Sequence, residues 1–185
     1  SDSEVALECI SKYGFYNAIK KLNGMFAIAA YCISKKTLWL ARDRFGEKPL
    51  YYNYDTTYGF TFASELRAFS YFPNFKKQIC QSALAQYLRY GYVPEPLSIF
   101  KKTYKLEPGY IIKFDKKNQI LKKDYWNSIK SFVNAKKNKF KGTFEDAKEK
   151  VKRHIDYSIR NRLVSDVPLG IFLSGGIDSS LIAHY

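Results

Sequence analysis

The residues with the clearest potential for chemistry lie in the string "SGGIDSS", from Ser174 to Ser180. Two adjacent glycines let a backbone come close to an anion, so that several N–H groups converge on it. The serine hydroxyls can donate further hydrogen bonds to phosphate oxygens. Asp178 repels a phosphate by itself, and its presence is explained if Mg²⁺ bridges the carboxylate and the phosphates. The string lacks the lysine of a Walker A loop, and an ordinary glycine turn is the alternative.

A helix, a strand and a second helix are expected around this string. Thr143, with Asp146 three residues later, predicts a helix N-terminus, and apolar residues then recur at every fourth position. The run "LGIFL" at 169–173 is typical of a buried strand, and a new helix is expected to begin near Asp178. This order predicts the entry to an open, parallel α/β sheet, where a helix N-terminus favours a bound anion.

The first 126 residues alternate between helical and strand patterns. Apolar spacing from Glu4 to Lys21, broken by Gly14, predicts two short helices. Ser64 is expected to cap a further short helix, and a longer helix is expected from Ser82 to Gly91. Three pairs of apolar runs predict antiparallel hairpins: 22–33 with 37–44, 49–55 with 58–64 around the turn Thr56-Thr57, and 108–115 with 119–126 around residues 116–118. Residues 127–142 are rich in Lys and Asn and predict an inter-domain linker.

Composition excludes several classes of protein. No apolar run approaches the ~20 residues that a membrane-spanning helix needs, and the start "SDSEVALECI" predicts a chain that begins in mid-protein rather than a signal peptide. The net charge of +14 raises the possibility of nucleic-acid binding, but the lysines occur in pairs at turns, which favours a solvated surface. The three cysteines predict free buried thiols in a reducing cytosol, and the two histidines are too isolated to predict a metal site.

Several motifs of this sequence resemble those of known families. The string "SGGIDSS" after a strand resembles the PP-loop of the ATP pyrophosphatases. The stretch "LNGMFAIAAYCISKKTLWLARDRFGEKPLYY", followed by "FASELRAF", resembles the second half of a class II glutamine amidotransferase domain. The string "SDVPLGIFLSGGIDSS" is similar to the entry of a synthetase domain. Together these motifs resemble the glutamine-hydrolysing asparagine synthetases.

The resemblance implies a fold and an activity. It implies an α+β N-terminal-nucleophile hydrolase domain in part (residues 1–126, αββα layers of antiparallel sheets), a linker (127–142) and the start of a parallel α/β PP-loop domain (143–185). The family's enzymes hydrolyse glutamine on a cysteine and use the ammonia to amidate aspartate, which ATP and Mg²⁺ activate as an adenylate. The implied ligands are therefore glutamine, aspartate and ATP, without nucleic acid or membrane. A cytoplasmic location and a homodimer are also implied.

Only some positions inherit a role from the resemblance. Asp2 matches the acid that holds the α-amino group of glutamine, with a helix N-cap as its alternative role. The implied ATP-binding residues are Leu173, Ser174, Gly175, Gly176, Asp178 and Ser179, with Asp178 also reaching Mg²⁺ through the pyrophosphate. Arg42 and Asp43 fit a structural ion pair equally well, and Tyr51 and Tyr52 fit sheet packing, so none of these four is placed in a site.

The sequence also departs from the family. Residue 1 is Ser where the resemblance would place the nucleophilic cysteine, and the arginine for the glutamine carboxylate is absent. We therefore expect an internal fragment that is inactive by itself. Three alternatives stay open: a sibling enzyme that amidates a sugar acid or closes a β-lactam ring, a degenerate amidotransferase-like protein, and a basic binding protein without catalysis.

Overall fold

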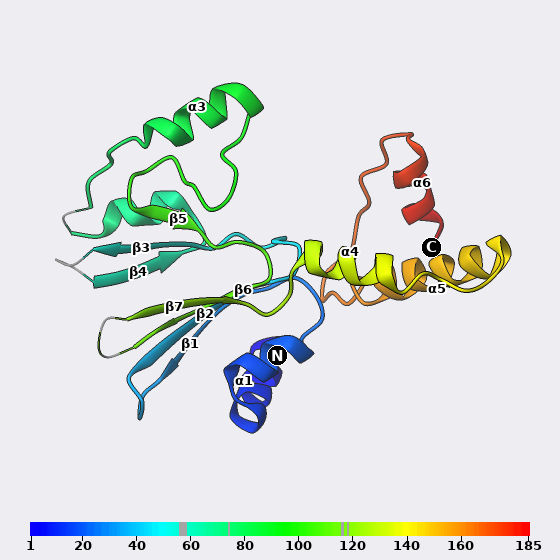
Figure 1. Cartoon of the computed structure of the whole chain (residues 1–185), viewed down its shortest axis with the longest axis horizontal. Helices are drawn as coiled ribbons and strands as arrows, with labels where there is room; N and C mark the ends of the chain where they lie inside the picture. The colour runs from blue at the N-terminus through cyan, green and yellow to red at the C-terminus, as the bar shows by residue number, and fades with distance from the viewer. Residues whose placement is uncertain (56–58, 74, 116, 118) are drawn as a thin grey trace. The chain divides into compact units, whose positions relative to one another are not determined.

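The computed structural model describes residues 1–55, 59–73, 75–115, 117 and 119–185, and it contains two compact units (Figure 1). The first unit comprises Ser1–Ser131 and the second Phe132–Tyr185. Each unit is described by itself below.

Two antiparallel sheets form the centre of the first unit. The four-stranded sheet has the order β1-β2-β6-β7, with β1 Ala27–Cys32, β2 Thr37–Arg42, β6 Tyr110–Phe114 and β7 Ile120–Asp124. The three-stranded sheet has the order β4-β3-β5, with β3 Tyr51–Asp55, β4 Gly59–Ala63 and β5 Thr103–Lys105. The three predicted hairpins are confirmed as the pairs β1–β2, β3–β4 and β6–β7. The predicted turn at Thr56-Thr57 and residues 116 and 118 of the third turn lie outside the described residues.

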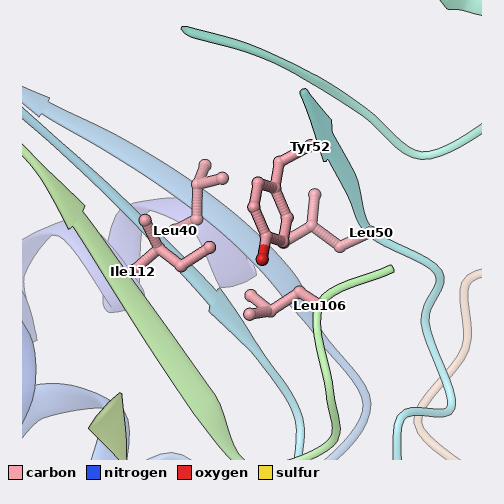
Figure 2. Packing of buried hydrophobic residues seen from close by; sticks show 5 residues of the cluster. All are labelled: Leu40, Leu50, Tyr52, Leu106 and Ile112. Carbon is pink, nitrogen blue, oxygen red and sulfur yellow. The ribbon is translucent and has the colours of Figure 1, made fainter. Parts of the chain in front are cut away.

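A hydrophobic core lies between the two sheets (Figure 2). Leu40 of β2 and Ile112 of β6 are register partners, and both are fully buried. Tyr52 of β3 closes the core from the second sheet, which confirms its predicted packing role. Burial raises the pKa of the Tyr52 hydroxyl to about 12, because the phenolate form is disfavoured away from water.

Helices cover the outer face of the four-stranded sheet. They are α1 (Asp2–Tyr13) and α2 (Phe15–Lys21), separated at Gly14 as predicted. Phe15 of α2 packs against Ala41 and Ile111, the neighbours of Leu40 and Ile112 along their strands, and its ring stacks on Trp39. Because side chains alternate between the two faces of a strand, β2 and β6 are buried on both faces.

The three-stranded sheet has helical segments beside it. These are the 3₁₀ helix η1 (Leu66–Tyr71) and the helix α3 (Gln81–Tyr90), which Figure 1 shows on the side away from α1. The order of layers is therefore helix, sheet, sheet, helix, and the predicted α+β class is confirmed. The expected cap of the short helix is wrong: Glu65 occupies the N-cap position of η1, without a side-chain hydrogen bond. Gly91 ends α3 in the left-handed conformation, as the sequence predicts.

The second unit consists of helices joined by extended chain. Helix α4 (Ser128–Lys137) occupies most of the predicted linker and runs across the boundary between the units, α5 spans Phe144–Arg160, and α6 spans Ile177–His184. The predicted capping box at the start of α5 is confirmed, with the Thr143 N–H donating to Asp146 Oδ2 over 2.9 Å. The predicted domain boundaries stay a prediction.

The predicted strand at 169–173 is not formed. These residues belong to no strand, and the side chain of Phe172 is fully exposed. A β-strand depends on hydrogen bonds to a neighbouring strand, and among the described residues no segment pairs with this one. The sequence pattern was that of a buried strand, but the second unit as described offers no sheet for it to join.

Candidate functional site

A cavity of about 620 Å³ opens beside the first turn of α1 in the first unit. Its walls come from α1, the segment between α2 and β1, the start of β1, the loop after β2, and the residue that follows β4. They are formed by Asp2, Ser3, Ala6, Leu22, Asn23, Gly24, Met25, Phe26, Ala27, Ile28, Lys48, Pro49 and Ser64. The volume is in the range of about 300–1,000 Å³ that is typical of small-ligand sites.

Asp2 contributes a carboxylate to this cavity. The alternative role of Asp2 as a helix N-cap is wrong, because Ser1 is the N-cap of α1 and forms a capping box with Glu4. Asp2 Oδ1 accepts a hydrogen bond from the Ser3 backbone N–H over 2.7 Å. Among the described residues Asp2 forms no ion pair, so its negative charge is available to a ligand.

The loop that follows β2 is organised by the buried carboxylate of Asp43. Its Oδ1 accepts from the backbone N–H groups of Phe45 and Glu47, over 3.1 and 3.0 Å. Its Oδ2 accepts from those of Lys48 and Phe26, over 3.0 and 3.3 Å. Phe26 and Lys48 both line the cavity, so this one carboxylate fixes two of the cavity's walls.

Arg42 holds the same loop from its other side. Its guanidinium donates to the carbonyl oxygens of Lys48, Gly46 and Leu106, over 2.6–2.7 Å. It also pairs with Glu95 over 3.2 Å, so the ion-pair partner of Arg42 is Glu95 and not the adjacent Asp43. Burial alone raises the pKa of Glu95, but its backbone hydrogen bond and the nearby cations lower that pKa overall. Arg42 and Asp43, which are adjacent in the sequence, therefore each have a structural role.

The glycine-rich loop lies in the second unit, and the structure gathers most of its predicted residues. Gly175 has φ of +77°, a left-handed conformation that glycine adopts without strain, and Gly176 is the N-cap of α6. The hydroxyl oxygens of Ser174 and Ser179 lie 3.0 Å apart, and the Gly176 N–H donates to Ser174 Oγ over 3.4 Å. Leu173 precedes the loop with an exposed side chain. The Ser179 hydroxyl also donates to the carbonyl oxygen of Gly176 over 3.1 Å.

Asp178 lies in the first turn of α6, where it lines a cleft of about 310 Å³ between α5 and α6. The rest of the lining is mostly apolar and includes Ile155 and Ile159, which belong to the predicted apolar face of α5. The cleft therefore places one carboxylate at the edge of an apolar surface, beside the helix N-terminus. The two carboxylates that the sequence predicts in binding sites, Asp2 and Asp178, thus belong to different compact units.

The structure also bears on the remaining sequence expectations. The three cysteines are free but half-buried, so the expectation of buried thiols is wrong in that respect. In the part of the chain that the structure describes, no group of three or more His, Cys, Asp or Glu side chains could hold a metal ion. Within the same residues, no helix is both long and apolar enough to cross a membrane.

Comparison with protein families assigns the larger unit. A model described as glutamine amidotransferase domain matches residues 1–126, more than half of the chain. The chain belongs to the glutamine amidotransferase domain family. A second model, described as asparagine synthase, matches residues 150–185 and includes the glycine-rich loop. The cavity beside Asp2 thus lies in the glutamine amidotransferase domain, and the loop lies in the segment similar to asparagine synthase.

Individual relatives carry both segments in one protein. A putative asparagine synthetase (glutamine-hydrolyzing) from Methanocaldococcus jannaschii is 36% identical over 98% of this chain, which covers 34% of that protein. Asparagine synthetase (glutamine-hydrolyzing) 1 from Bacillus subtilis is 37% identical over 98% of this chain, which covers 27% of that protein. An amidase, chry2, from Gibberella zeae is 28% identical over 99% of this chain, which covers 26% of that protein. The chain therefore spans about a third or less of the length of these relatives.

These relatives confirm the predicted resemblance to the glutamine-hydrolysing asparagine synthetases. The roles of Asp2 and of the glycine-rich loop stay predictions. Sequence reasoning missed Lys48, which lines the same cavity as Asp2. Its signal in the sequence is its place in "ARDRFGEKPLYY", the same motif that contains the two residues that organise the loop, Arg42 and Asp43.

Proposed function

We propose that this chain is part of a glutamine-hydrolysing asparagine synthetase. The observation that carries the proposal is the occurrence of a glutamine amidotransferase domain and an asparagine synthase segment in one chain. In the proposed reaction the whole protein releases ammonia from glutamine. It activates the side-chain carboxylate of aspartate with ATP and transfers the ammonia to it, which gives asparagine, AMP and pyrophosphate.

The amidotransferase domain would bind glutamine in the cavity beside Asp2. A carboxylate that has no ion pair among the described residues is a suitable partner for the α-ammonium group of an amino acid. The cavity walls are fixed by hydrogen bonds that Arg42 donates and Asp43 accepts, which keeps the entropic cost of ligand binding low.

The glycine-rich loop fits the phosphates of ATP. Gly175 and Gly176 leave the backbone open to a close approach, and the N–H groups at the start of α6 favour negative charge. Ser174 and Ser179 would add hydroxyl donors, and Leu173 would contribute its backbone beside the nucleotide. Asp178 is a suitable oxygen ligand for Mg²⁺, whose remaining ligands would be phosphate oxygens and water. Bound Mg²⁺ would neutralise charge on the pyrophosphate leaving group.

The test uses the whole protein that carries these residues, with two reactions measured separately. Asp2→Asn is expected to abolish glutamine-dependent ammonia release and to spare asparagine synthesis from added ammonia. Asp178→Asn is expected to abolish aspartate-dependent pyrophosphate release and to spare glutamine hydrolysis. Glu8→Gln on the exposed face of α1 and Glu149→Gln on α5 are the matched controls, and both should keep the two reactions.

The acceptor is tested in the same assay, because relatives named amidase are also similar to this chain. Pyrophosphate release that needs aspartate supports the asparagine synthetase. Release that needs another carboxylic acid would support a sibling enzyme, and an absence of both reactions would refute the proposed function. A cytoplasmic location and a homodimer belong to the same proposal.

A further inference from the structure

The first unit contains a second cavity of about 620 Å³, on the outer face of the four-stranded sheet. We call it the aromatic cavity. Its walls come from α1, α2, the β1–β2 hairpin and β6, and it shares no lining residue with the cavity beside Asp2. They are formed by Leu7, Ile10, Ser11, Tyr13, Gly14, Phe15, Tyr16, Asn17, Ala30, Tyr31, Cys32, Lys35, Thr37, Trp39 and Lys113. The volume is typical of a site for a small ligand.

One row of the sheet contributes the indole ring of Trp39 to this cavity. Ala30, Trp39 and Lys113 are register partners on β1, β2 and β6. The ring of Trp39 stacks on Phe15, which is buried under α2, with 5.3 Å between the ring centroids. Trp39 itself is only half-buried, and its neighbour Ala30 is too small to cover it. The sheet thus offers a fixed aromatic ring that is partly open.

The helices add further aromatic rings to the same cavity. Tyr13, the last residue of α1, is exposed, and Tyr16 of α2 is half-buried. Aromatic side chains favour offset stacking or edge-to-face contact with another planar ring. The three rings of Trp39, Tyr13 and Tyr16 therefore favour a ligand with a planar ring of its own.

The charge of the aromatic cavity has one sign. Lys35 and Lys113 line it, and no Asp or Glu belongs to its lining. Among the described residues neither lysine forms an ion pair, whereas other lysines of the first unit do, such as Lys122 with Glu107. A wall that holds two unpaired cations is complementary to an anion.

Further ammonium groups strengthen this positive field from around the cavity. The Nζ atom of Lys21 lies 4.7 Å from the centroid of the Tyr13 ring, and that of Lys20 lies 4.5 Å from the centroid of the Tyr16 ring. Lys123 of β7 approaches Tyr16 as well, over 4.9 Å. The rings of the wall are thus surrounded by cations, which raises the local concentration of anionic molecules.

We propose that the aromatic cavity binds a small anion that carries a planar aromatic ring. The ring of the ligand would stack on Trp39 and the two tyrosines, and its anionic group would pair with Lys35 and Lys113. Nucleotides and aromatic carboxylic acids share this chemistry. The inference goes beyond the proposed function and does not depend on it, since no residue of the cavity beside Asp2 or of the glycine-rich loop takes part.

Cys32 provides a reporter for occupation of this cavity. Its half-buried thiol lines the wall, and Sγ lies 3.4 Å from Ser34 Oγ. The hydrogen bond with Ser34 lowers the pKa of the Cys32 thiol, with a smaller contribution from Lys35, and thiolate is the form that iodoacetamide alkylates. A bound ligand should shield this thiol.

Cys80 is the matched control within the same protein. It is half-buried, its Sγ lies 3.2 Å from Ser82 Oγ, and this hydrogen bond lowers its pKa in the same way. Cys80 does not belong to the lining of the aromatic cavity. Its alkylation should therefore be independent of the ligand.

The experiment measures the alkylation of each cysteine by mass spectrometry, in the whole protein that carries these residues. The two probes are AMP, a nucleotide, and indole-3-acetate, an aromatic carboxylate. At least one of them should slow alkylation of Cys32 by about tenfold at about ten times its dissociation constant, and leave Cys80 unchanged. The uncharged counterparts adenosine and indole-3-acetamide should not protect Cys32, and neither should the counterparts without an aromatic ring, ribose 5-phosphate and acetate.

Two variants test the lysines. Lys35→Met and Lys113→Met should each raise the dissociation constant of the protecting probe by about tenfold, because a hydrogen bond between charged groups is lost. The constant is taken from the ratio of rates with and without probe, since Lys35 itself affects the reactivity of Cys32. Lys36→Met is the matched control, because Lys36 is next in the chain but outside the lining, and it should bind as the wild type.

The source of the ligand follows from which probe protects: AMP alone indicates a nucleotide, and indole-3-acetate alone indicates an aromatic acid. Protection by neither probe would overturn the inference. Equal protection by an uncharged or a ring-free counterpart would overturn it too, because the charge or the ring would then play no part. Unchanged affinity in both lysine variants would have the same meaning. None of these outcomes affects ammonia release from glutamine, so the proposed function is tested separately.

Discussion

Replacement of Asp43 with asparagine tests whether one buried carboxylate holds the loop after β2. The substitution keeps the size of the side chain but replaces one acceptor oxygen with an NH₂ group. The two oxygens of Asp43 accept two backbone N–H groups each. Whichever way the asparagine amide is oriented, two of these backbone N–H groups then face a donor and lose their partner.

The expected cost follows from these two lost hydrogen bonds. A hydrogen bond to a charged group contributes about 1.5–3 kcal/mol, so Asp43→Asn should lower the free energy of unfolding by about 3–6 kcal/mol. This is a large part of the ~5–15 kcal/mol that stabilises an ordinary domain. The assay is urea unfolding followed by tryptophan emission. Trp39 and Trp126 both lie in the first unit, so the signal reports on that unit.

Asp115 provides the matched control. Its Oδ1 accepts from the backbone N–H groups of Lys117 and Gln119, over 2.9 and 3.1 Å, but both hydrogen bonds are exposed, so that water can replace them. Asp115→Asn should therefore cost less than about 1 kcal/mol. If Asp43→Asn costs no more than Asp115→Asn, with the same dependence on urea, then Asp43 does not organise the loop and the reasoning is refuted.

Two further predictions concern the same network. Gly46 has φ of +66°, and an added Cβ would lie 2.9 Å from Arg42 Cζ, so Gly46→Ala should destabilise the first unit by about 2–4 kcal/mol. Gly91→Ala, with φ of +76° and no atom within 4 Å of the added Cβ, should cost only about 1–2 kcal/mol in the same urea assay; equal costs would contradict the steric argument. Burial raises the pKa of Glu95, but its backbone hydrogen bond, Lys105 and Arg42 lower that pKa overall. The ionised Glu95 carboxylate therefore stabilises the folded chain above pH 4.5, its ordinary pKa. This contribution is lost as the pH falls through the lowered pKa that the carboxyl has in the folded chain. Glu95→Gln should reduce the fall in the free energy of unfolding at acid pH. An unchanged pH dependence would contradict a stabilising role of the Arg42–Glu95 ion pair.

Local signals predicted most of the fold correctly. Gly14 and Gly91 separate or end helices because glycine adopts a left-handed backbone without strain, and both positions have φ above +70°. The capping box at Thr143 and Asp146 involves residues three apart, so it can be recognised without any tertiary structure. The hairpins follow from alternation and short turns for the same reason.

Features that depend on distant residues were not predictable. Strand formation at 169–173 requires a neighbouring strand, and β-propensity does not provide one. The partner of Arg42 is Glu95, 53 residues away, while the adjacent Asp43 turns to four backbone N–H groups. The candidate site shows the same limit. Asp2 was proposed from its motif, whereas only the folded chain shows that Lys48, which is distant in the sequence, lines the same cavity.

The burial of β2 and β6 on both faces has a consequence for how this sequence can change over evolution. Leu40 and Ile112 contribute to one core, and their neighbours Ala41 and Ile111 contribute to the other. A change in side-chain volume on either face moves the strand that the opposite core also uses, because interiors are closely packed. The two cores are therefore under a joint constraint. Accepted substitutions in these two strands should occur as compensating sets that include residues of α2 and β3, and rarely as single steps.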